Sequence, residues 1–324
     1  MGKIVMIGEP MAMFVAKTSG KLKDVRDFQM FTAGAEVNVS VGAVRLGHEV
    51  EYITQLGKDP FGEYIQEYLE QEGIGTSFIQ TTADFPTGFQ LKNKVEKNDP
   101  EVVYFRKGSA ASHLGKELLE KIDFSDADIF HVTGIFMALN DMTYELIKAL
   151  IVKAKEQGAL ITFDPNLRPT LWESQKLMVE RINEIASYAD YVLPGIGEGF
   201  ILTGYAEKEE IADFYLEKGA KGVIIKAGSN GAYAKCLLED GGVFEQNMYG
   251  FKLEQVIDTV GAGDGFAVGV ITGLLEKLSM EEILTRANAI GAIQVSHISD
   301  NENLPTQEKL TAFIDSYKTN GGME

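Results

Sequence analysis

The sequence of 324 residues has little cysteine: Cys236 is the only one. One cysteine cannot form an intrachain disulfide bond, and it cannot build a metal site from several thiolates. Cys236 lies in residues 232–238, an alternating stretch that is typical of a strand. We therefore expect a packed side chain, because buried cysteine usually behaves as a small hydrophobe, and a catalytic nucleophile is the alternative.

The chain also lacks an apolar run long enough to span a bilayer. Its first residues show no secretory signal, because residues 3–8 already have the pattern of a core strand. Hydrophobic residues make up 45% of the sequence and charged residues 24%, the balance of a soluble globular protein. These absences favour a cytoplasmic protein.

Positive charge is scarce as well. The sequence contains 30 Lys and Arg against 48 Asp and Glu, a formal net charge of −18, and it has no basic run. Such a surface repels nucleic acid and anionic membranes, so we expect neither as a partner. A site for an anionic substrate would need arginines of its own, because the surrounding field repels an anion.

Short apolar segments alternate with amphipathic ones along most of the chain. Residues 3–8 and 129–133 are apolar runs typical of buried strands, whereas residues 33–47 and 143–157 have the periodicity of helices. This alternation predicts a parallel sheet with helices on both faces. Since no repeat, low-complexity run or linker interrupts it, we interpret residues 1–324 as a single α/β domain.

Two regions break that alternation, and both are strand-like with no helix between their strands. The second contains a hairpin pattern around Asn98-Asp99-Pro100. We expect the four strands to form a small antiparallel sheet that projects from the main domain, built from about residues 9–33 and 86–108. The strand-like segments are residues 11–17, 28–32, 87–94 and 101–107.

An irregular edge of the main sheet is the plainer interpretation of these segments. A lid over a ligand site is favoured, because one face is predicted to carry Phe89, Tyr104 and Arg106, which suit contacts to a polar ligand. The apolar strands near Met11, Met13 and Phe14 would also suit a homo-oligomer formed through the lid.

Residues 258–264 read Asp-Thr-Val-Gly-Ala-Gly-Asp and directly precede a predicted helix. Residues 261–263 let the backbone turn tightly, and exposed N–H groups at a helix start bind phosphoryl groups. Asp264 would be a poor phosphate ligand, because like charges repel. We interpret it as a base that accepts a proton from an attacking hydroxyl, with an ordinary acidic helix start as the alternative.

The same string resembles the C-terminal signature of the ribokinase-like (PfkB) carbohydrate kinases. Residues 34–40, Gly-Ala-Glu-Val-Asn-Val-Ser, followed by Leu46-Gly47, resemble the N-terminal signature of that family, and residues 55–62 resemble its next segment. The likeness runs from Gly8 to at least Asp300. It implies a three-layer α/β/α core with a small β lid, which binds ATP at the carboxyl end of the sheet.

The resemblance also implies roles for individual residues. The N–H groups of Gly261, Ala262 and Gly263 would meet the charge on the transferred phosphoryl group, and Asp264 would activate the sugar hydroxyl. The implied sugar-binding residues are Gly34, Ala35, Asn38, Phe89, Tyr104, Arg106, Arg168, Asp264 and Asp300. The implied ATP-binding residues are Asn166, Arg168, Lys226, Gly228, Ser229, Gly231 and Asn288, together with residues 261–264.

For residues 226–231 an ordinary strand-to-strand turn is the alternative. ATP implies Mg²⁺, and the family resemblance allows a monovalent cation as well. The family's Asn-x-x-Glu motif has Gly195 in place of its Asn here, so only Glu198 remains to orient Mg²⁺, through water.

Within the family the chain looks most like the 2-keto-3-deoxygluconate kinases, through residues 104–111 and 163–169. Arginine pairs with a carboxylate through two parallel hydrogen bonds, so Arg106 and Arg168 would suit a sugar acid, with Tyr104 as a hydroxyl donor. For Arg168 a structural ion pair or a contact to ATP is the alternative. Phe89 departs from these kinases, which usually have Tyr there.

Three other functions compete with a sugar-acid kinase. A fructokinase has the same fold. A non-catalytic sugar-binding regulator should have lost Asp264 or the glycines before it, and both are present. A Rossmann-type dehydrogenase should show Gly-x-Gly-x-x-Gly after the first strand, which Gly8-Glu9-Pro10-Met11 does not.

Overall fold

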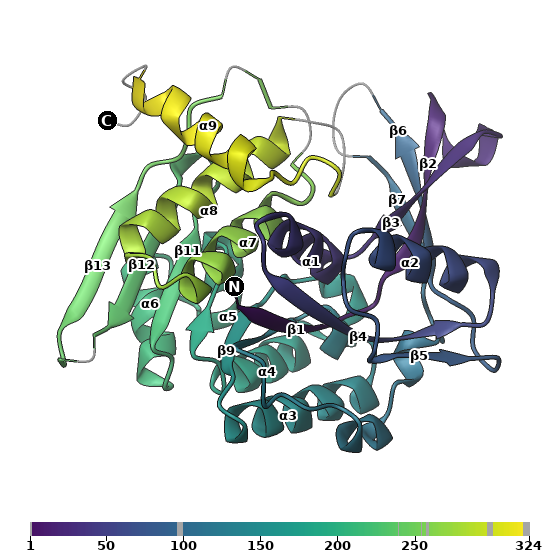
Figure 1. Cartoon of the computed structure of the whole chain (residues 1–324), viewed down its shortest axis with the longest axis horizontal. Coiled ribbons are helices and arrows are strands. Elements are labelled where there is room, and N and C mark those ends of the chain that lie inside the picture. Colours follow the sequence, from purple (N-terminus) through teal and green to yellow (C-terminus); the bar gives the residue numbers. More distant parts are fainter. Residues whose placement is uncertain are drawn as a thin grey trace.

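The computed structural model describes residues 2–95, 100–238, 240–253, 255–256, 259–296 and 301–319. Within these residues, nine strands form one large sheet in the order β13-β12-β11-β10-β9-β8-β1-β4-β5 (Figure 1). From β5 to β11 all neighbours are parallel, and β12 and β13 add two antiparallel strands at one edge. The strands are β1 (Lys3–Ile7), β4 (Glu49–Gly57), β5 (Ile79–Thr82), β8 (Ile129–Thr133), β9 (Leu160–Asp164), β10 (Tyr191–Val192), β11 (Gly222–Lys226), β12 (Ala232–Leu237) and β13 (Val243–Met248).

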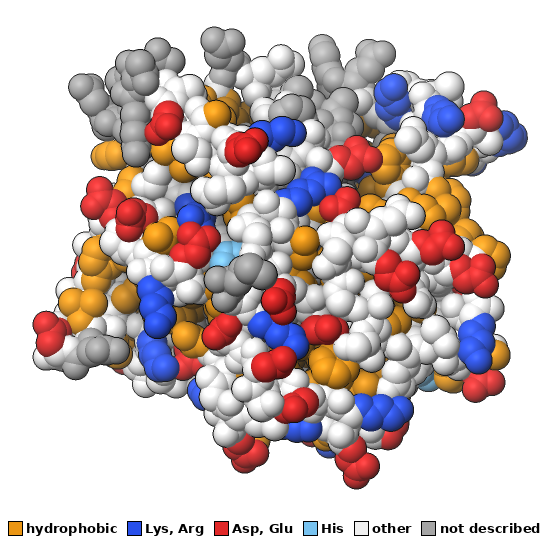
Figure 2. Space-filling model, in the orientation of Figure 1, with side chains coloured by type: hydrophobic (Ala, Val, Ile, Leu, Met, Phe, Trp, Pro, Cys, Tyr) orange, Lys and Arg blue, Asp and Glu red, His pale blue; other side chains and the backbone are white. Residues whose placement is uncertain are grey.

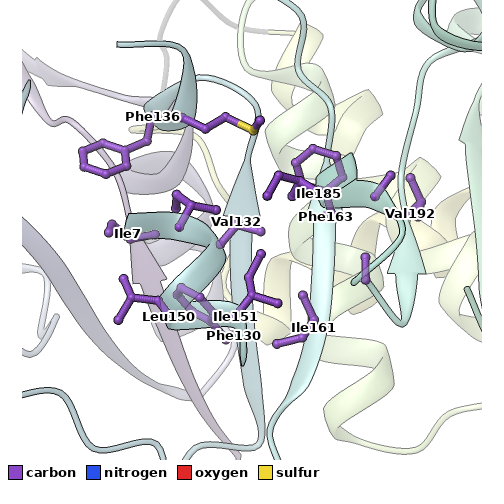
Figure 3. Packing of buried hydrophobic residues seen from close by; sticks show 14 of the residues in the cluster. Ile7, Phe130, Val132, Phe136, Leu150, Ile151, Ile161, Phe163, Ile185 and Val192 are labelled. Carbon is purple, nitrogen blue, oxygen red and sulfur yellow. The ribbon is translucent and has the colours of Figure 1, made fainter. Parts of the chain in front are cut away.

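Helices cover both faces of this sheet, as the alternating pattern predicts. On one face α3, α4, α5 and α6 pack against side chains such as Phe130 and Phe163, and Figure 3 shows part of that core. On the other face α1, α2, α7 and α8 pack against Ile4 and Met6. The helices are α1 (Ala35–Arg45), α2 (Pro60–Gln71), α3 (Asp141–Glu156), α4 (Gln175–Ala186), α5 (Ile196–Thr203), α6 (Lys208–Glu217), α7 (Ala262–Leu275), α8 (Met280–Val295) and α9 (Gln307–Thr319). The three-layer α/β/α prediction is confirmed.

A second sheet of four strands stands beside the large one, in the order β3-β2-β6-β7. Its strands overlap the four predicted segments, with β2 and β3 ending slightly beyond theirs, and we call this sheet the lid. The predicted small antiparallel sheet is confirmed in its two outer strand pairs, whereas its two central strands, β2 and β6, run parallel. Both leave the core in the same direction, so no hairpin can join them. The strands are β2 (Met11–Ser19), β3 (Phe28–Ala33), β6 (Phe89–Lys94) and β7 (Val102–Phe105).

The lid otherwise follows the sequence pattern. β2 pairs antiparallel with β3, and β6 pairs antiparallel with β7. Of the predicted turn between β6 and β7, Asn98 and Asp99 lie outside the described residues. The division of the chain into one domain with this insert stays a prediction.

Two helix starts bring distant parts of the chain together. Gly34 precedes α1 with φ of 149°, and Gly261 precedes α7 with φ of 76°, both in the region that favours glycine. A Cβ atom at Gly42 of α1 would lie 2.5 Å from a methyl group of Val268 of α7, so the two helices pack closely there. A hydrogen bond from Asn38 in the first turn of α1 to Asp264 in the first turn of α7 shows that the two helix starts lie side by side.

The burial of Cys236, the character of the helices and the surface charge can be compared with the expectations from composition. Cys236 is buried in β12, and burial raises the pKa of its thiol to about 12, which confirms a packed side chain. Among the described helices, none combines the length and the apolar character that a membrane span requires. On the face drawn in Figure 2, Lys and Arg side chains are scattered among acidic ones.

Candidate active site

The predicted site residues meet at the carboxyl ends of the parallel strands. The chain runs from β1 to β4 on one side and later enters β8 on the other, and ligands of open α/β sheets bind at such a switch point. A cavity of about 670 Å³ opens there between core and lid. Its lining includes Glu9, Met11, Met13, Gly34, Ala35, Glu36, Asn38, Gln90, Lys92, Tyr104, Arg106, Asn166, Arg168, Glu198, Lys226, Gly261, Gly263 and Asp264.

Asp264 lies in the first turn of α7 and is only 9% exposed. Its Oδ2 accepts a hydrogen bond from Asn38 Nδ2 at 2.7 Å, and its Oδ1 accepts one from Asn166 Nδ2 at 3.2 Å. Burial raises the pKa of Asp264 to about 6, with Asp164 adding to the rise and Asn38, Arg168 and Lys226 opposing it. Two hydrogen bonds thus fix the orientation of the carboxylate, and its raised pKa makes it more basic, as a general base requires.

The helix start beside Asp264 has the features of an anion site. The first N–H groups of a helix have no acceptor within that helix, and its dipole favours negative charge. A Cβ atom at Gly263 would meet only Lys226 Nζ, at 3.8 Å, among its neighbours. The space over this turn is therefore open to a ligand and bounded by an ammonium group.

Lys226 ends β11 and sits among carboxylates. Its Nζ donates to both oxygens of Asp164, at 2.8 and 2.7 Å, and lies 3.9 Å from Glu198 Oε2. Burial alone would lower the pKa of Lys226, but Asp164, Glu198 and Asp264 outweigh it and raise the pKa above its ordinary value. The group stays charged at neutral pH.

Glu198, the predicted magnesium residue, already accepts two backbone hydrogen bonds. Its Oε2 accepts from Gly195 N and its Oε1 from Leu167 N, each at 2.7 Å. It therefore caps α5 and ties that helix to the segment after β9. Among the described residues, no three His, Cys, Asp or Glu side chains gather as a metal site would need.

Arg168 lies in the cavity wall, where its Nη1 donates to its neighbours' carbonyls, Leu167 O at 3.0 Å and Asn166 O at 3.4 Å. The alternative of a structural ion pair finds no support within the described chain, because no carboxylate pairs with it there. Arg168 can turn towards a ligand without breaking a salt bridge.

Arg106 also lines the cavity, but a carboxylate that the sequence interpretation missed already holds it. Its Nε donates to Glu9 Oε2 at 2.6 Å, and its Nη2 lies 2.5 Å from the same oxygen. Glu9 is 2% exposed and also accepts a hydrogen bond from Ser109 Oγ. The Arg106 guanidinium therefore lies in the site as part of an ion pair with Glu9 whose net charge is zero.

Phe89 does not face the cavity, so the prediction that it shares a lid face with Tyr104 and Arg106 is wrong. It pairs across the strands with Phe105 and stacks on that ring at 4.6 Å. Side chains alternate along a strand, so its neighbour Gln90, opposite Tyr104, points into the cleft instead. Lys92 follows on the same face as Gln90, and both were missed.

A fourth missed residue, Glu36, is buried in the first turn of α1. Its Oε1 accepts a hydrogen bond from Thr133 Oγ1 at the end of β8. Burial raises the pKa of Glu36 to about 7, opposed by Thr133 and raised further by Asp264. Nothing in the local pattern marks it, because an acidic residue at a helix start is ordinary.

Three of the predicted nucleotide residues, Ser229, Gly231 and Asn288, lie beside one segment, 248–250. A Cβ atom at Gly231 would lie 2.1 Å from Met248 O, and one at Gly250 would lie 2.8 Å from Ser229 O. Asn288 Nδ2 of α8 donates to Tyr249 O at 3.3 Å. Gly228 begins the short turn that contains Ser229. These residues adjoin one another but do not line the cavity, and Asp300 lies outside the described residues.

Comparisons with known proteins agree with this geometry. The sequence profile of the pfkB family carbohydrate kinases matches residues 1–307. A 2-dehydro-3-deoxygluconokinase of Bacillus subtilis (strain 168) is 45% identical over 320 residues, which cover 97% of this chain and 96% of that one. A 2-dehydro-3-deoxygluconokinase of Thermoproteus tenax is 31% identical over 317 residues, 96% of this chain and 94% of that one.

Among solved structures, a PfkB protein from Polaromonas sp. JS666 superimposes with a TM-score of 0.87. It is 41% identical, and the match covers 96% of this chain and all of that one. The fold, the open helix start with its buried aspartate, and the full-length match to one family lead to one conclusion. The chain belongs to the pfkB family of carbohydrate kinases.

Proposed function

We propose that the protein transfers the γ-phosphoryl group of ATP to the terminal hydroxyl of a sugar acid, 2-keto-3-deoxygluconate, and forms its 6-phosphate. The observation that carries the proposal is Asp264, a buried carboxylate with a pKa of about 6 placed directly beside the start of α7. The identity to two curated 2-dehydro-3-deoxygluconokinases supports the choice of sugar.

The base acts on the sugar. Asn38 and Asn166 each donate to one oxygen of Asp264, so the carboxylate cannot rotate away from the cavity. The sugar hydroxyl transfers its proton to Asp264 as its oxygen bonds to the γ-phosphorus. The bond between that phosphorus and the bridging oxygen of ADP breaks in the same step. A base with a pKa near 6 is ionised at neutral pH and still basic enough to help.

The phosphoryl group is stabilised by fixed positive groups. The N–H groups of Gly261, Ala262 and Gly263 at the start of α7 would face its oxygens, and the Lys226 ammonium borders the same space. Phosphoryl transfer needs mainly alignment and charge neutralisation, which this arrangement can supply. Residues 228–231 and Asn288 would then lie towards the adenosine.

Mg²⁺ fits the site only as a partner of the nucleotide. Asp164 is held by Lys226 and Glu198 by two backbone N–H groups, so neither forms a ready cage, and Mg²⁺ commonly keeps several waters and binds through phosphates. Bound there, it would neutralise charge on the phosphates, with Glu198 orienting one of its waters. A monovalent cation is tested by exchanging K⁺ for tetramethylammonium in the assay.

The carboxylate of the sugar acid would bind Arg168, with Tyr104 donating its hydroxyl and Arg106 its remaining N–H groups. Arg168 is suited to this role because it has no carboxylate partner within the described residues. A fructokinase would leave the guanidinium without a matching anion. A regulator without catalysis would not need the two asparagines that aim Asp264.

The proposal is tested by ATP turnover with purified protein on a panel of sugars. The panel contains 2-keto-3-deoxygluconate, gluconate, fructose and ribose, and product formation is measured with a coupled ADP assay and by mass spectrometry. We expect 2-keto-3-deoxygluconate to have the highest kcat/KM. A preference for fructose would overturn the sugar-acid assignment and leave the kinase assignment intact.

We also propose that two copies associate through the outer face of the lid. Phe89 and Phe105 stack there, and Phe14 and Phe61 adjoin Phe89, while Phe105 is 47% exposed. Figure 2 shows hydrophobic side chains gathered on the side where Figure 1 places the lid. Light scattering of the wild type and of Phe105→Glu measures the mass.

We place the protein in the cytoplasm, where its substrates are available, and fractionation of cells tests that.

A further inference from the structure

Glu9 occupies the point where the lid joins the core. It lies between β1 and lid strand β2, and its carboxylate contacts Arg106 and Ser109, which follow lid strand β7. A Cβ atom at Gly88, just before lid strand β6, would lie 2.8 Å from Glu9 Oε1. Three of the crossings between lid and core therefore meet at one buried carboxylate.

The charges of the cavity show what this carboxylate does. Four cationic side chains line the cavity: Lys92, Arg106, Arg168 and Lys226. Lys226 is held by Asp164, Arg106 by Glu9, and Lys92 has an interaction of its own. Within the described chain, Arg168 is the cavity arginine that donates only to neutral carbonyl groups.

We propose that Glu9 is a specificity-determining residue that limits the sugar pocket to ligands with one negative charge, because it neutralises Arg106. The inference rests on the proposed function, since it takes the carboxylate of the sugar acid to be the ligand of Arg168. It adds a second property, which is discrimination against sugars that carry two anionic groups, such as an aldarate or an already phosphorylated sugar acid.

The physical argument is a competition for one guanidinium. A second anionic group could take Arg106 as its own ion-pair partner only by displacing Glu9, and Glu9 would then be a buried carboxylate without its cation, which is costly. Arg106 Nη2 is buried and has no hydrogen bond of good geometry, so the residue can still donate to a hydroxyl or share a carboxylate. Asp264 in the same wall adds further negative charge against a dianion.

Three probes of one carbon skeleton separate these effects. Glucitol, gluconate and glucarate carry zero, one and two negative charges, and isothermal titration calorimetry measures their Kd for each variant without turnover. For the wild type we expect gluconate to bind more tightly than glucitol, and glucarate no more tightly than gluconate. In Glu9→Gln we expect the Kd for glucarate to decrease by about tenfold or more, the usual value of one charge-assisted pair.

The controls isolate the charge of Glu9. Ser109→Ala removes the other hydrogen bond to Glu9 and keeps the charge, so the ratio of glucarate to gluconate affinity should stay at the wild-type value. Glu9→Gln combined with Arg106→Met removes both charges, so the gain for glucarate should disappear. Circular dichroism melting checks that each variant is folded.

The outcomes distinguish the two proposals. If gluconate binds wild type no better than glucitol, the sugar-acid function is wrong. If gluconate is preferred but wild type binds glucarate much more tightly still, the limit to one charge is wrong, whatever the variants do. Equal weakening of all three probes in Glu9→Gln would reduce Glu9 to a structural residue and overturn the inference.

Discussion

The two walls of the cavity are built differently. In the core wall, α1, β9, α5, α7 and β11 are linked through side chains: Asn38 and Asn166 hold Asp264, and Lys226 holds Asp164. In the lid wall, Tyr104 is 48% exposed, and Arg106 pairs with Glu9. The core wall is thus organised before any ligand binds, whereas Tyr104 in the lid wall is half exposed. We infer that the core wall carries the chemistry and the lid wall the choice of sugar.

Gly263→Val should break the core wall most completely. The branched side chain would occupy the space of the phosphoryl oxygens, so we expect kcat/KM to fall by at least about 10³-fold, the upper range for losing one such donor. The fold should survive, because Lys226 Nζ at 3.8 Å is the nearest neighbour of the added Cβ. Steady-state kinetics and circular dichroism measure the two effects.

Gly197→Val is the matched control, since Gly197 is also the second residue of its helix and has open space around its Cα. It should keep most of the activity. Unchanged turnover in Gly263→Val would mean that the start of α7 does not hold the phosphoryl group.

Asp264→Asn should lower kcat by about 10²–10⁴-fold, the usual contribution of a positioned base, and leave ATP affinity nearly intact. Turnover gives kcat, and calorimetry gives the nucleotide Kd. In the wild type, kcat/KM should decline as the pH falls below about 6, because the base becomes protonated. Turnover of the variant at the wild-type rate would remove Asp264 from the mechanism.

The same substitution should stabilise the fold above pH 6. Burial raises the pKa of Asp264 from 3.8 to about 6, so the folded state holds its proton more tightly than the unfolded state. The free energy of unfolding therefore decreases between about pH 4 and pH 6, and the cost is fully present above that window. Asparagine removes the charge but turns one donor towards Asn38 or Asn166, so we expect a net gain on the order of 1 kcal/mol at pH 8. Urea unfolding at pH 4 and pH 8 measures it, and a gain that is equal at both pH values would contradict the assignment.

Arg168→Lys tests whether Arg168 binds the sugar or the nucleotide. The lysine keeps the charge but loses the planar fork, so kcat/KM for 2-keto-3-deoxygluconate should fall by about one to two decades. Residual turnover of fructose, which has no carboxylate, should change much less. An equal loss for both sugars would assign Arg168 to the nucleotide instead.

The lid wall should give the smallest effects, and they separate its two faces. Gln90→Leu should raise KM for the sugar by about 3–10-fold, the worth of one hydrogen bond, because Gln90 points into the cleft. Phe89→Tyr should change KM by less than about twofold, since that ring stacks on Phe105 on the outer face. A larger effect of the Phe89 substitution would mean that Phe89, and not Gln90, points into the cleft.

The start of α7 and the place of Asp264 in its first turn could be predicted, because one continuous string, residues 258–264, encodes both. The prediction of which lid face carries Phe89 was wrong. Residues 89–92 alternate apolar and polar, which places Phe89 and Gln90 on opposite faces, but only the pairing of Gln90 with Tyr104 shows which face meets the cleft.

Glu9, Glu36 and the parallel contact of β2 with β6 could not be predicted for a different reason. Glu9 meets Arg106 across 97 residues of chain, and Glu36 meets Thr133 across the same separation. No turn or spacing signals such contacts, because they form only when the core closes. Short elements such as α5, with two glycines in eight residues, were also missed, since their helical pattern is weak.

The central position of β1 has a consequence for the order of synthesis. The first strand made pairs with β4 about 46 residues later but must wait for β8, about 125 residues later, to cover its other edge. A nascent chain that has reached only residue 120 therefore carries a half sheet with an open, apolar edge, the kind of edge that recruits other chains. Ribosome pausing in that interval should favour aggregation more than pausing after residue 133.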